Sequence, residues 1–214
     1  PTGSWRRPDR GFRFRIPALF YVFLSLVCTQ IPLLQTLGYE FSALLALVAS
    51  VVSGITTARY VAQHAVGDER LQTGRLFRKA LTAHLAILAI PLAIMAANAI
   101  RIRNCSFPDG LVFFVLLPVV SVWFSACIAT FCAVHYRHPR LLFVACIGVT
   151  LLYAAALGYW TPAVYAYNVF FGFFPGFTYD EELRPDLTLV LFRLFTAGLG
   201  LVFLRMGLLL ASLT

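Results

Sequence analysis

The feature that most constrains this chain is a series of apolar runs of about 18 or more residues with almost no charge, each long enough to cross the ~30 Å hydrocarbon core of a bilayer as an α-helix. Of the 214 residues, 60% are apolar and only 12% are charged, and the mean hydropathy is +0.83. A soluble domain is about 45–50% apolar and about 25% charged. So few charged residues cannot cover the outside of a soluble fold of this size.

Because the apolar runs are continuous rather than alternating, they predict helices and not the strands of a membrane β-barrel. The predicted fold class is therefore all-α, a polytopic membrane helix bundle with about six transmembrane helices. A basic cytoplasmic arm over residues 1–15 precedes a transmembrane helical domain over residues 16–214. The apolar runs place the helices at about 16–34, 41–58, 80–100, 111–134, 141–159 and 187–204.

The distribution of Lys and Arg predicts the orientation of the bundle. With the N-terminus in the cytoplasm, 13 of the 17 Lys and Arg residues lie in inner segments, three lie in outer segments, and Arg193 lies within a helix. Cytoplasmic ends of membrane helices collect basic residues, so this bias predicts an N-in/C-in topology. It also accounts for the net charge of +8. No basic stripe interleaved with exposed aromatic residues points to nucleic acid as a partner.

Several helices carry packing signals. Pro91 and Pro118 lie inside 80–100 and 111–134 and predict kinks. The polar stretch 68–79 predicts an interfacial connector between helices. Small residues at spacings of three and four form one face of the second helix, which suits close packing in lipid. They are Ala43, Ala46, Ser50, Ser53, Gly54 and Thr57.

The segment 160–186 combines many aromatic residues with helix-breaking Gly and Pro. Aromatic side chains prefer the headgroup layer of a bilayer. We therefore expect an outer segment that lies in the interface or dips into the bilayer, with one short helix. Whether it is interfacial or re-entrant stays open at this point.

Arg193 is the clearest charge inside a predicted membrane helix, about 10 Å below Asp186 by helical rise. An intramembrane arginine is a functional hypothesis by default. The structural alternative is that its long side chain snorkels outward and pairs with a carboxylate of the segment 180–182.

The end of the aromatic segment is a charged cluster of Asp180, Glu181, Glu182 and Arg184. Paired carboxylates can perform acid–base chemistry or bind a metal. The alternative is a solvated rim whose carboxylates pair with nearby arginines.

The inner loop between 111–134 and 141–159 contains His135, Arg137, His138 and Arg140. Two histidines alone do not make a zinc site, which needs further ligands. We expect these four side chains to contact anionic lipid headgroups. No metal or cofactor is predicted anywhere in the chain.

The chain contains no HExxH, GxSxG, P-loop or GxGxxG motif, so whether it is an enzyme stays open. Four of its five cysteines lie in apolar runs, where cysteine behaves as a small hydrophobic residue. The remaining one, Cys105, lies in a loop. These cysteines form neither a disulfide framework nor a CxxC pair.

Two stretches carry a resemblance, Arg101–Cys105 with Gly110–Pro118, and Asn168–Glu181. They resemble the N-terminal multi-pass region of bacterial proteins that carry a peptidase MA-like, gluzincin-type metallopeptidase domain after the membrane part. The resemblance implies an anchor and outer platform, with the zinc site in the downstream domain, so no catalytic residue is assigned here. It also implies a bacterial inner membrane and a chain that continues beyond Thr214.

Three functional hypotheses remain. The first is an integral membrane module that anchors or supports another domain or partner, as the membrane part of a longer bacterial protein. The second is a permease subunit of an ABC-type or other transporter, with an ATPase subunit as partner. The third is a membrane enzyme that acts on lipid at the outer face, using the charged cluster at 180–186.

Overall fold

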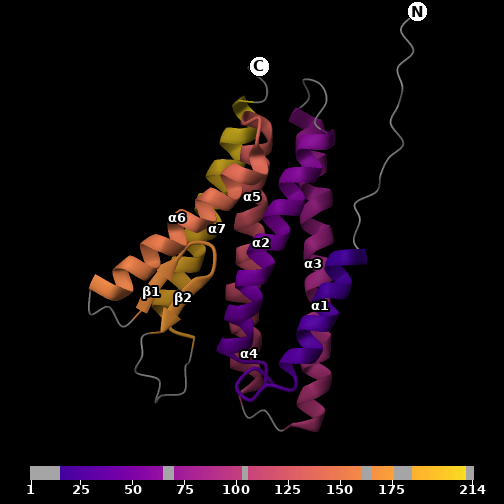
Figure 1. Cartoon of the computed structure of the whole chain (residues 1–214), viewed down its shortest axis with the longest axis vertical. Coiled ribbons are helices and arrows are strands. Elements are labelled where there is room, and N and C mark those ends of the chain that lie inside the picture. Colours follow the sequence, from indigo (N-terminus) through magenta and orange to yellow (C-terminus); the bar gives the residue numbers. More distant parts are fainter. Residues whose placement is uncertain (1–14, 65–69, 103–105, 161–164, 176–184, 211–214) are drawn as a thin grey trace, which may run out of the picture.

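The computed structural model describes residues 15–64, 70–102, 106–160, 165–175 and 185–210. Within these ranges the chain forms a helical bundle with one two-stranded β-hairpin (Figure 1). The elements are α1 (Arg15–Cys28), α2 (Tyr39–His64), α3 (Arg70–Arg101), α4 (Phe107–Phe114), η1 (Val115–Val119), α5 (Val120–His135), α6 (Pro139–Trp160), β1 (Tyr165–Asn168), β2 (Gly172–Pro175) and α7 (Leu187–Leu210). Helix α4, the π-helical turn η1 and helix α5 follow one another without a break.

The all-α bundle predicted from the apolar runs is confirmed. Among the described residues, five helices are long and apolar enough to cross a membrane: α2, α3, the continuous α4–η1–α5, α6 and α7. Helix α1 is shorter, with 14 residues. At about 1.5 Å per residue it extends about 21 Å, less than the ~30 Å of the hydrocarbon core.

Helix α1 ends at Cys28, so its predicted extent of 16–34 is wrong at the C-terminal end. The Thr29 hydroxyl donates to the carbonyl oxygen of Leu26 at 2.7 Å, which satisfies a carbonyl in the last turn of the helix. Pro32 disfavours a helical conformation in the residue before it, and Leu33 has a φ of 78°. The chain therefore reaches α2 through a series of turns.

At one end of the bundle, the predicted helices are too short. Helix α2 continues to His64 rather than ending at 58, and α3 begins at Arg70 rather than at 80. The predicted connector 68–79 is thus largely the first turns of α3. Outside a bilayer, charged side chains can remain hydrated while their backbone groups bond within the helix, so polarity alone does not end a helix there.

The segment 160–186 differs from its prediction in secondary structure. Helix α6 extends to Trp160, and the described residues 165–175 form an antiparallel hairpin instead of the expected short helix. In the register of this hairpin, Asn168 faces Gly172. Aromatic residues fit a pleated strand well, which is consistent with this outcome.

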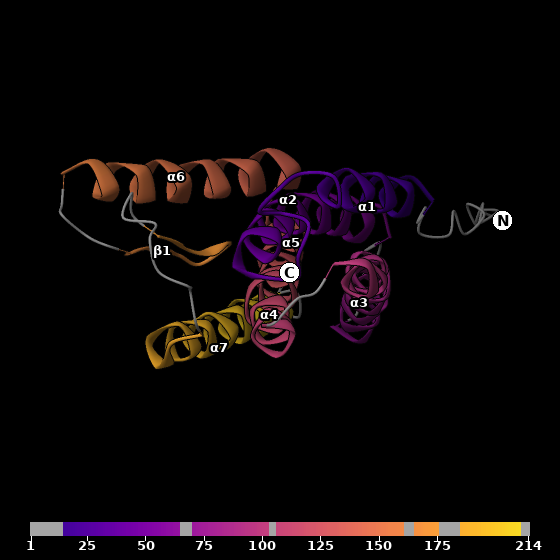
Figure 2. The same ribbon diagram turned by 90° about the horizontal axis from the view of Figure 1, so that it is seen from below.

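Helices α2 and α5 form the centre of the bundle. Figure 2 shows α1 and α3 on one side of this pair and α6, the hairpin and α7 on the other. The small-residue face predicted for α2 is buried, with Ala43 half-buried at its edge. It permits close helix packing, because a Cβ atom on Gly54 would overlap the ring of Phe143 in α6.

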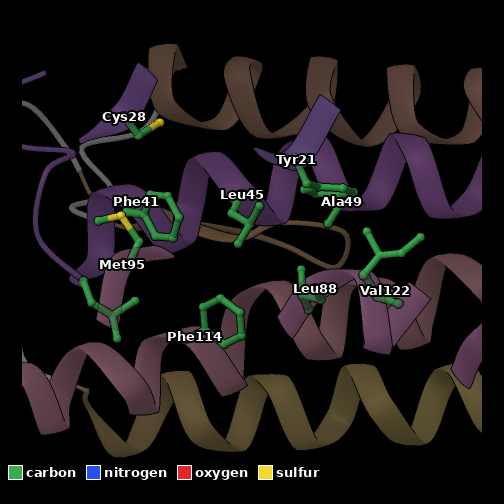
Figure 3. Packing of buried hydrophobic residues seen from close by; sticks show 11 residues of the cluster. Tyr21, Cys28, Phe41, Leu45, Ala49, Leu88, Met95, Phe114 and Val122 are labelled. Carbon is green, nitrogen blue, oxygen red and sulfur yellow. The ribbon is translucent and has the colours of Figure 1, made fainter. Parts of the chain in front are cut away.

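The largest hydrophobic cluster lies where α1, α2, α3 and the α4–α5 helix meet (Figure 3). Tyr21 of α1, Leu45 of α2 and Leu88 of α3 are each no more than 2% exposed within it. The short α1 is therefore an integral part of the bundle and does not merely lie against its surface.

The two ends of the bundle differ in charge. The upper end in Figure 1, here called the basic end, carries seven exposed cations: Arg59, Arg75, Arg78, Lys79, Arg137, Arg140 and Arg205. The opposite end, here called the acidic end, carries the described carboxylates Glu40, Asp109 and Asp186 together with Arg101.

Candidate functional site

Arg193 lies in the second turn of α7, counted from the acidic end, and is only 1% exposed. Its guanidinium points into the bundle, where all four of its recorded acceptors are neutral oxygen atoms. Nε donates to Leu116 O at 2.7 Å, Nη1 to Val169 O at 3.2 Å, and Nη2 to Leu117 O at 2.8 Å and to Ser121 Oγ at 2.6 Å.

Two of these carbonyl oxygens lie in η1, the turn that contains Pro118. Proline has no backbone N–H, and its ring clashes with the carbonyl four residues earlier, so a regular α-helix cannot pass through it undisturbed. The chain widens here into a π-helical turn, a feature that often marks functional sites. Within this turn, the carbonyls of Leu116 and Leu117 accept hydrogen bonds from Arg193 of another helix.

The tip of the hairpin enters the bundle. Asn168, Phe170 and Phe171 are 4%, 2% and 1% exposed. The Asn168 amide donates to Thr150 O of α6 at 3.0 Å and accepts from the Phe170 N–H at 2.8 Å. The Ser50 hydroxyl of α2 donates to Phe170 O at 2.9 Å. Side chains of the protein itself thus satisfy both backbone groups of Phe170, which lies outside any helix.

Aromatic contacts hold the same tip in place. The ring of Phe170 packs edge to face against two other rings. Its centroid lies 5.0 Å from that of Phe124 in α5 and 5.9 Å from that of Phe143 in α6. Tyr167 contacts Phe192 of α7 at 4.9 Å between ring centroids. The described residues of this segment thus form a hairpin whose tip packs among the helices.

Gly172 allows the guanidinium and the hairpin to lie this close. Its φ of +107° is unfavourable for any residue with a Cβ atom. A Cβ at this position would overlap the side chain of Leu117 and lie 3.7 Å from the central carbon of the Arg193 guanidinium.

Arg193 therefore joins α7, η1 and the hairpin tip, three segments that are far apart in sequence. Four hydrogen bonds occupy most of its five N–H donors. The alternative of outward snorkelling is wrong, because the side chain turns inward and is buried. The carboxylates proposed as its partners, Asp180, Glu181 and Glu182, lie outside the described residues, as does Arg184.

Sequence reasoning identified Arg193 and Pro118 but did not connect them. It also missed Asn168 and Ser50, whose side chains satisfy the hairpin backbone. Their one signal is that each is a polar residue in an apolar or aromatic segment. From the sequence, Gly172 was recognised only as one of the helix-breaking residues of the aromatic segment.

His84 is a second ionisable residue inside a membrane-spanning helix. It is 3% exposed in α3, and its Nε2 lies 2.9 Å from the Thr56 hydroxyl of α2. This pair links two neighbouring helices, and no pattern in the sequence associates the two residues.

At the basic end, a cleft of about 490 Å³ lies between the end of α2 and the start of α6. Three of the four predicted headgroup contacts, Arg137, His138 and Arg140, are exposed and line it. Arg59 of α2 lines the opposite wall and was not predicted. His135 does not line the cleft. Its ring packs against Phe131 of the same helix, with 4.8 Å between the ring centroids.

Among the described residues, no group of three or more His, Cys, Asp or Glu side chains is positioned to hold a metal ion. Comparison of the chain with known protein families, with curated proteins and with solved structures finds no match.

Proposed function

We propose that this chain is an integral membrane module that anchors and supports another domain or partner. The observation that carries the proposal is the engagement of Arg193 by η1, by the hairpin tip and by Ser121 of α5. A residue used for transport or chemistry must release or exchange its partners. The donors of Arg193 instead fix the hairpin to the bundle, which suits a rigid support.

In this proposal the module is the membrane part of a longer bacterial protein in the inner membrane, with its N-terminus in the cytoplasm. The seven exposed cations at the basic end favour a cytoplasmic location for that end. The acidic end and the hairpin then face outward. The stretch Asn168–Glu181 resembles the multi-pass region of proteins with a downstream peptidase MA-like domain. That domain is the first candidate for the supported partner.

A permease subunit is the second candidate, and the interrupted helix α4–η1–α5 is the observation that favours it. Broken membrane helices form substrate sites in many transporters. In that case η1 and Arg193 would exchange their mutual hydrogen bonds for bonds to a substrate, and an ATPase subunit would bind at the basic end.

Photo-crosslinking in the bacterial membrane distinguishes these functions. A crosslinking amino acid replaces Tyr159 or Trp160, which are 85% and 78% exposed at the C-terminal end of α6, the end nearer the hairpin (Figure 1). Leu152, 72% exposed in the middle of the same helix, is the lipid-facing control. Arg75 reports on the basic end.

The anchoring proposal expects a discrete protein adduct at Tyr159 or Trp160, to a downstream domain or to a separate partner, and none at Leu152. Adducts to lipid alone at both Tyr159 and Trp160 would refute it. An ATPase adduct at Arg75, without a protein adduct at Tyr159 or Trp160, would establish the permease subunit instead.

A further inference from the structure

The cleft at the basic end has cations on both of its walls. Arg59 projects from the last turns of α2, while Arg137, His138 and Arg140 come from the connection to α6 and its first turn. The three arginines are exposed cations, and a guanidinium suits the binding of phosphate. The carboxylates that the structure describes lie at the opposite end of the bundle.

The same cleft has an apolar side that continues along α6 toward the membrane. Leu141 and Val144 line it and are 72% and 46% exposed. A ligand that fills the cleft thus meets cations at the end of the bundle and aliphatic side chains one turn deeper. This amphipathic lining matches a phospholipid more closely than a soluble anion, because a soluble anion has no acyl chain to contact the apolar wall.

The backbone reinforces the positive potential of the cleft. Helix α6 begins at Pro139, so the N–H groups of Arg140 and Leu141 lie in its first turn and have no acceptor within the helix. The positive end of the helix dipole points the same way.

We propose that this cleft binds an anionic phospholipid whose headgroup carries two phosphates, the cardiolipin type. Arg59 binds one phosphate from α2, and Arg137 and Arg140 bind the other from the opposite wall, while the acyl chains follow Leu141 and Val144 into the bilayer. Two cationic walls across a cleft of about 490 Å³ favour two linked phosphates over one. Basic pockets between membrane helices bind such headgroups in other proteins.

The test uses the full chain in phosphatidylcholine nanodiscs that contain either cardiolipin or phosphatidylglycerol, matched in total phosphate. Native mass spectrometry after release from the discs measures the fraction of protein that retains anionic lipid. The test variant carries Arg59→Gln and Arg140→Gln. The control variant carries Arg75→Gln and Arg78→Gln, which remove the same charge from exposed positions on α3 at the same end.

The wild-type chain is expected to retain cardiolipin in preference to phosphatidylglycerol. The test variant should bind cardiolipin roughly tenfold or more weakly, and the control variant should bind it like wild type. Both pairs of arginines are exposed, so thermal unfolding should confirm that both variants remain folded. Each single variant, Arg59→Gln or Arg140→Gln, should lose part of the affinity.

Three results would overturn the proposal. If both double variants lose the same share of cardiolipin binding, the lipid is attracted by the overall surface charge and not by a specific site. Equal retention of the two lipids at matched phosphate would exclude recognition of paired phosphates. Displacement of cardiolipin by dilute inorganic pyrophosphate would show that the cleft takes a soluble anion rather than a lipid.

Discussion

Arg193→Met should destabilise the bundle and release the hairpin. Methionine preserves much of the apolar volume of the arginine stem but removes all four donated hydrogen bonds. In membrane proteins, interhelical side-chain hydrogen bonds average about 0.6 kcal/mol, so four of them give about 2.4 kcal/mol. Acceptors left unpaired in a buried site increase this cost. We expect a loss of about 3 kcal/mol, equivalent to an increase on the order of a hundredfold in the unfolded population.

Two measurements check this expectation. Unfolding in mixed micelles with increasing denaturing detergent gives the change in stability. Maleimide labelling of Val169→Cys, in a background with the native cysteines replaced by alanine, reports exposure of the hairpin tip. Labelling should become faster when Arg193→Met is added, because the carbonyl of residue 169 loses its donor.

Arg205→Met is the matched control, since it removes the same charge from the same helix at an exposed position. Arg193→Lys should fall between the two, because an ammonium group keeps the charge but lacks the planar fork that reaches η1 and the hairpin together. If Arg193→Met is as stable as Arg205→Met and the tip stays protected, the guanidinium does not clamp the hairpin. The proposed supporting role would then lose its basis.

Three further outcomes are expected. Gly172→Ala should cost about 1–3 kcal/mol of stability because of its positive φ, whereas Gly198→Ala, which has open space around it, should cost nothing in the same unfolding assay. Gly54→Ala should cost about 1–3 kcal/mol by overpacking against a phenylalanine ring of α6, and Gly148→Ala, which meets no neighbour, is its control; equal stability would contradict this packing. Asp186 caps α7, and hydrogen bonds from the Thr188 hydroxyl and the Leu187 N–H lower the pKa of its carboxyl group. The carboxylate therefore stabilises the fold at neutral pH, and this contribution disappears as the pH falls below about 4. The difference in melting temperature between wild type and Asp186→Asn should vanish over that range, and a constant difference would exclude the titration.

The sequence was sufficient for the fold class because the length of an apolar run is itself the physical constraint on a membrane helix. It was not sufficient for helix ends outside the apolar runs. The stretch that begins at Arg70 is rich in cations, and a hydrated cation is compatible with either a helix or a loop. The hairpin was missed for a different reason. Aromatic residues suit both a strand and the headgroup layer, and the partners that make a strand favourable lie elsewhere in the chain.

For the candidate site, the sequence identified the charged residue but not the groups that bind it. A charge in an apolar run identifies Arg193 directly. Its acceptors are mostly main-chain carbonyls, which every residue has, so no residue type marks them. Pro118 alone indicated that the helix supplying these carbonyls would be irregular. The position of Pro118 in the sequence does not reveal that α7 packs beside that helix.

The proposed lipid cleft forms only because α2 and α6 make contact deeper in the bundle. The sequence does not reveal that contact, so it could not identify Arg59 as part of the cleft. Gly54 lies about one and a half turns below Arg59 on α2, and Phe143 lies about one turn below Arg140 on α6. Because the ring of Phe143 occupies the space that a Gly54 side chain would need, the two helices approach closely just below the arginines. The spacing of the cationic walls therefore follows from a glycine buried in the bundle. A substitution that separates α2 from α6 at this point should weaken cardiolipin retention without removing any charge, whereas a cleft formed only by flexible surface arginines would keep its affinity.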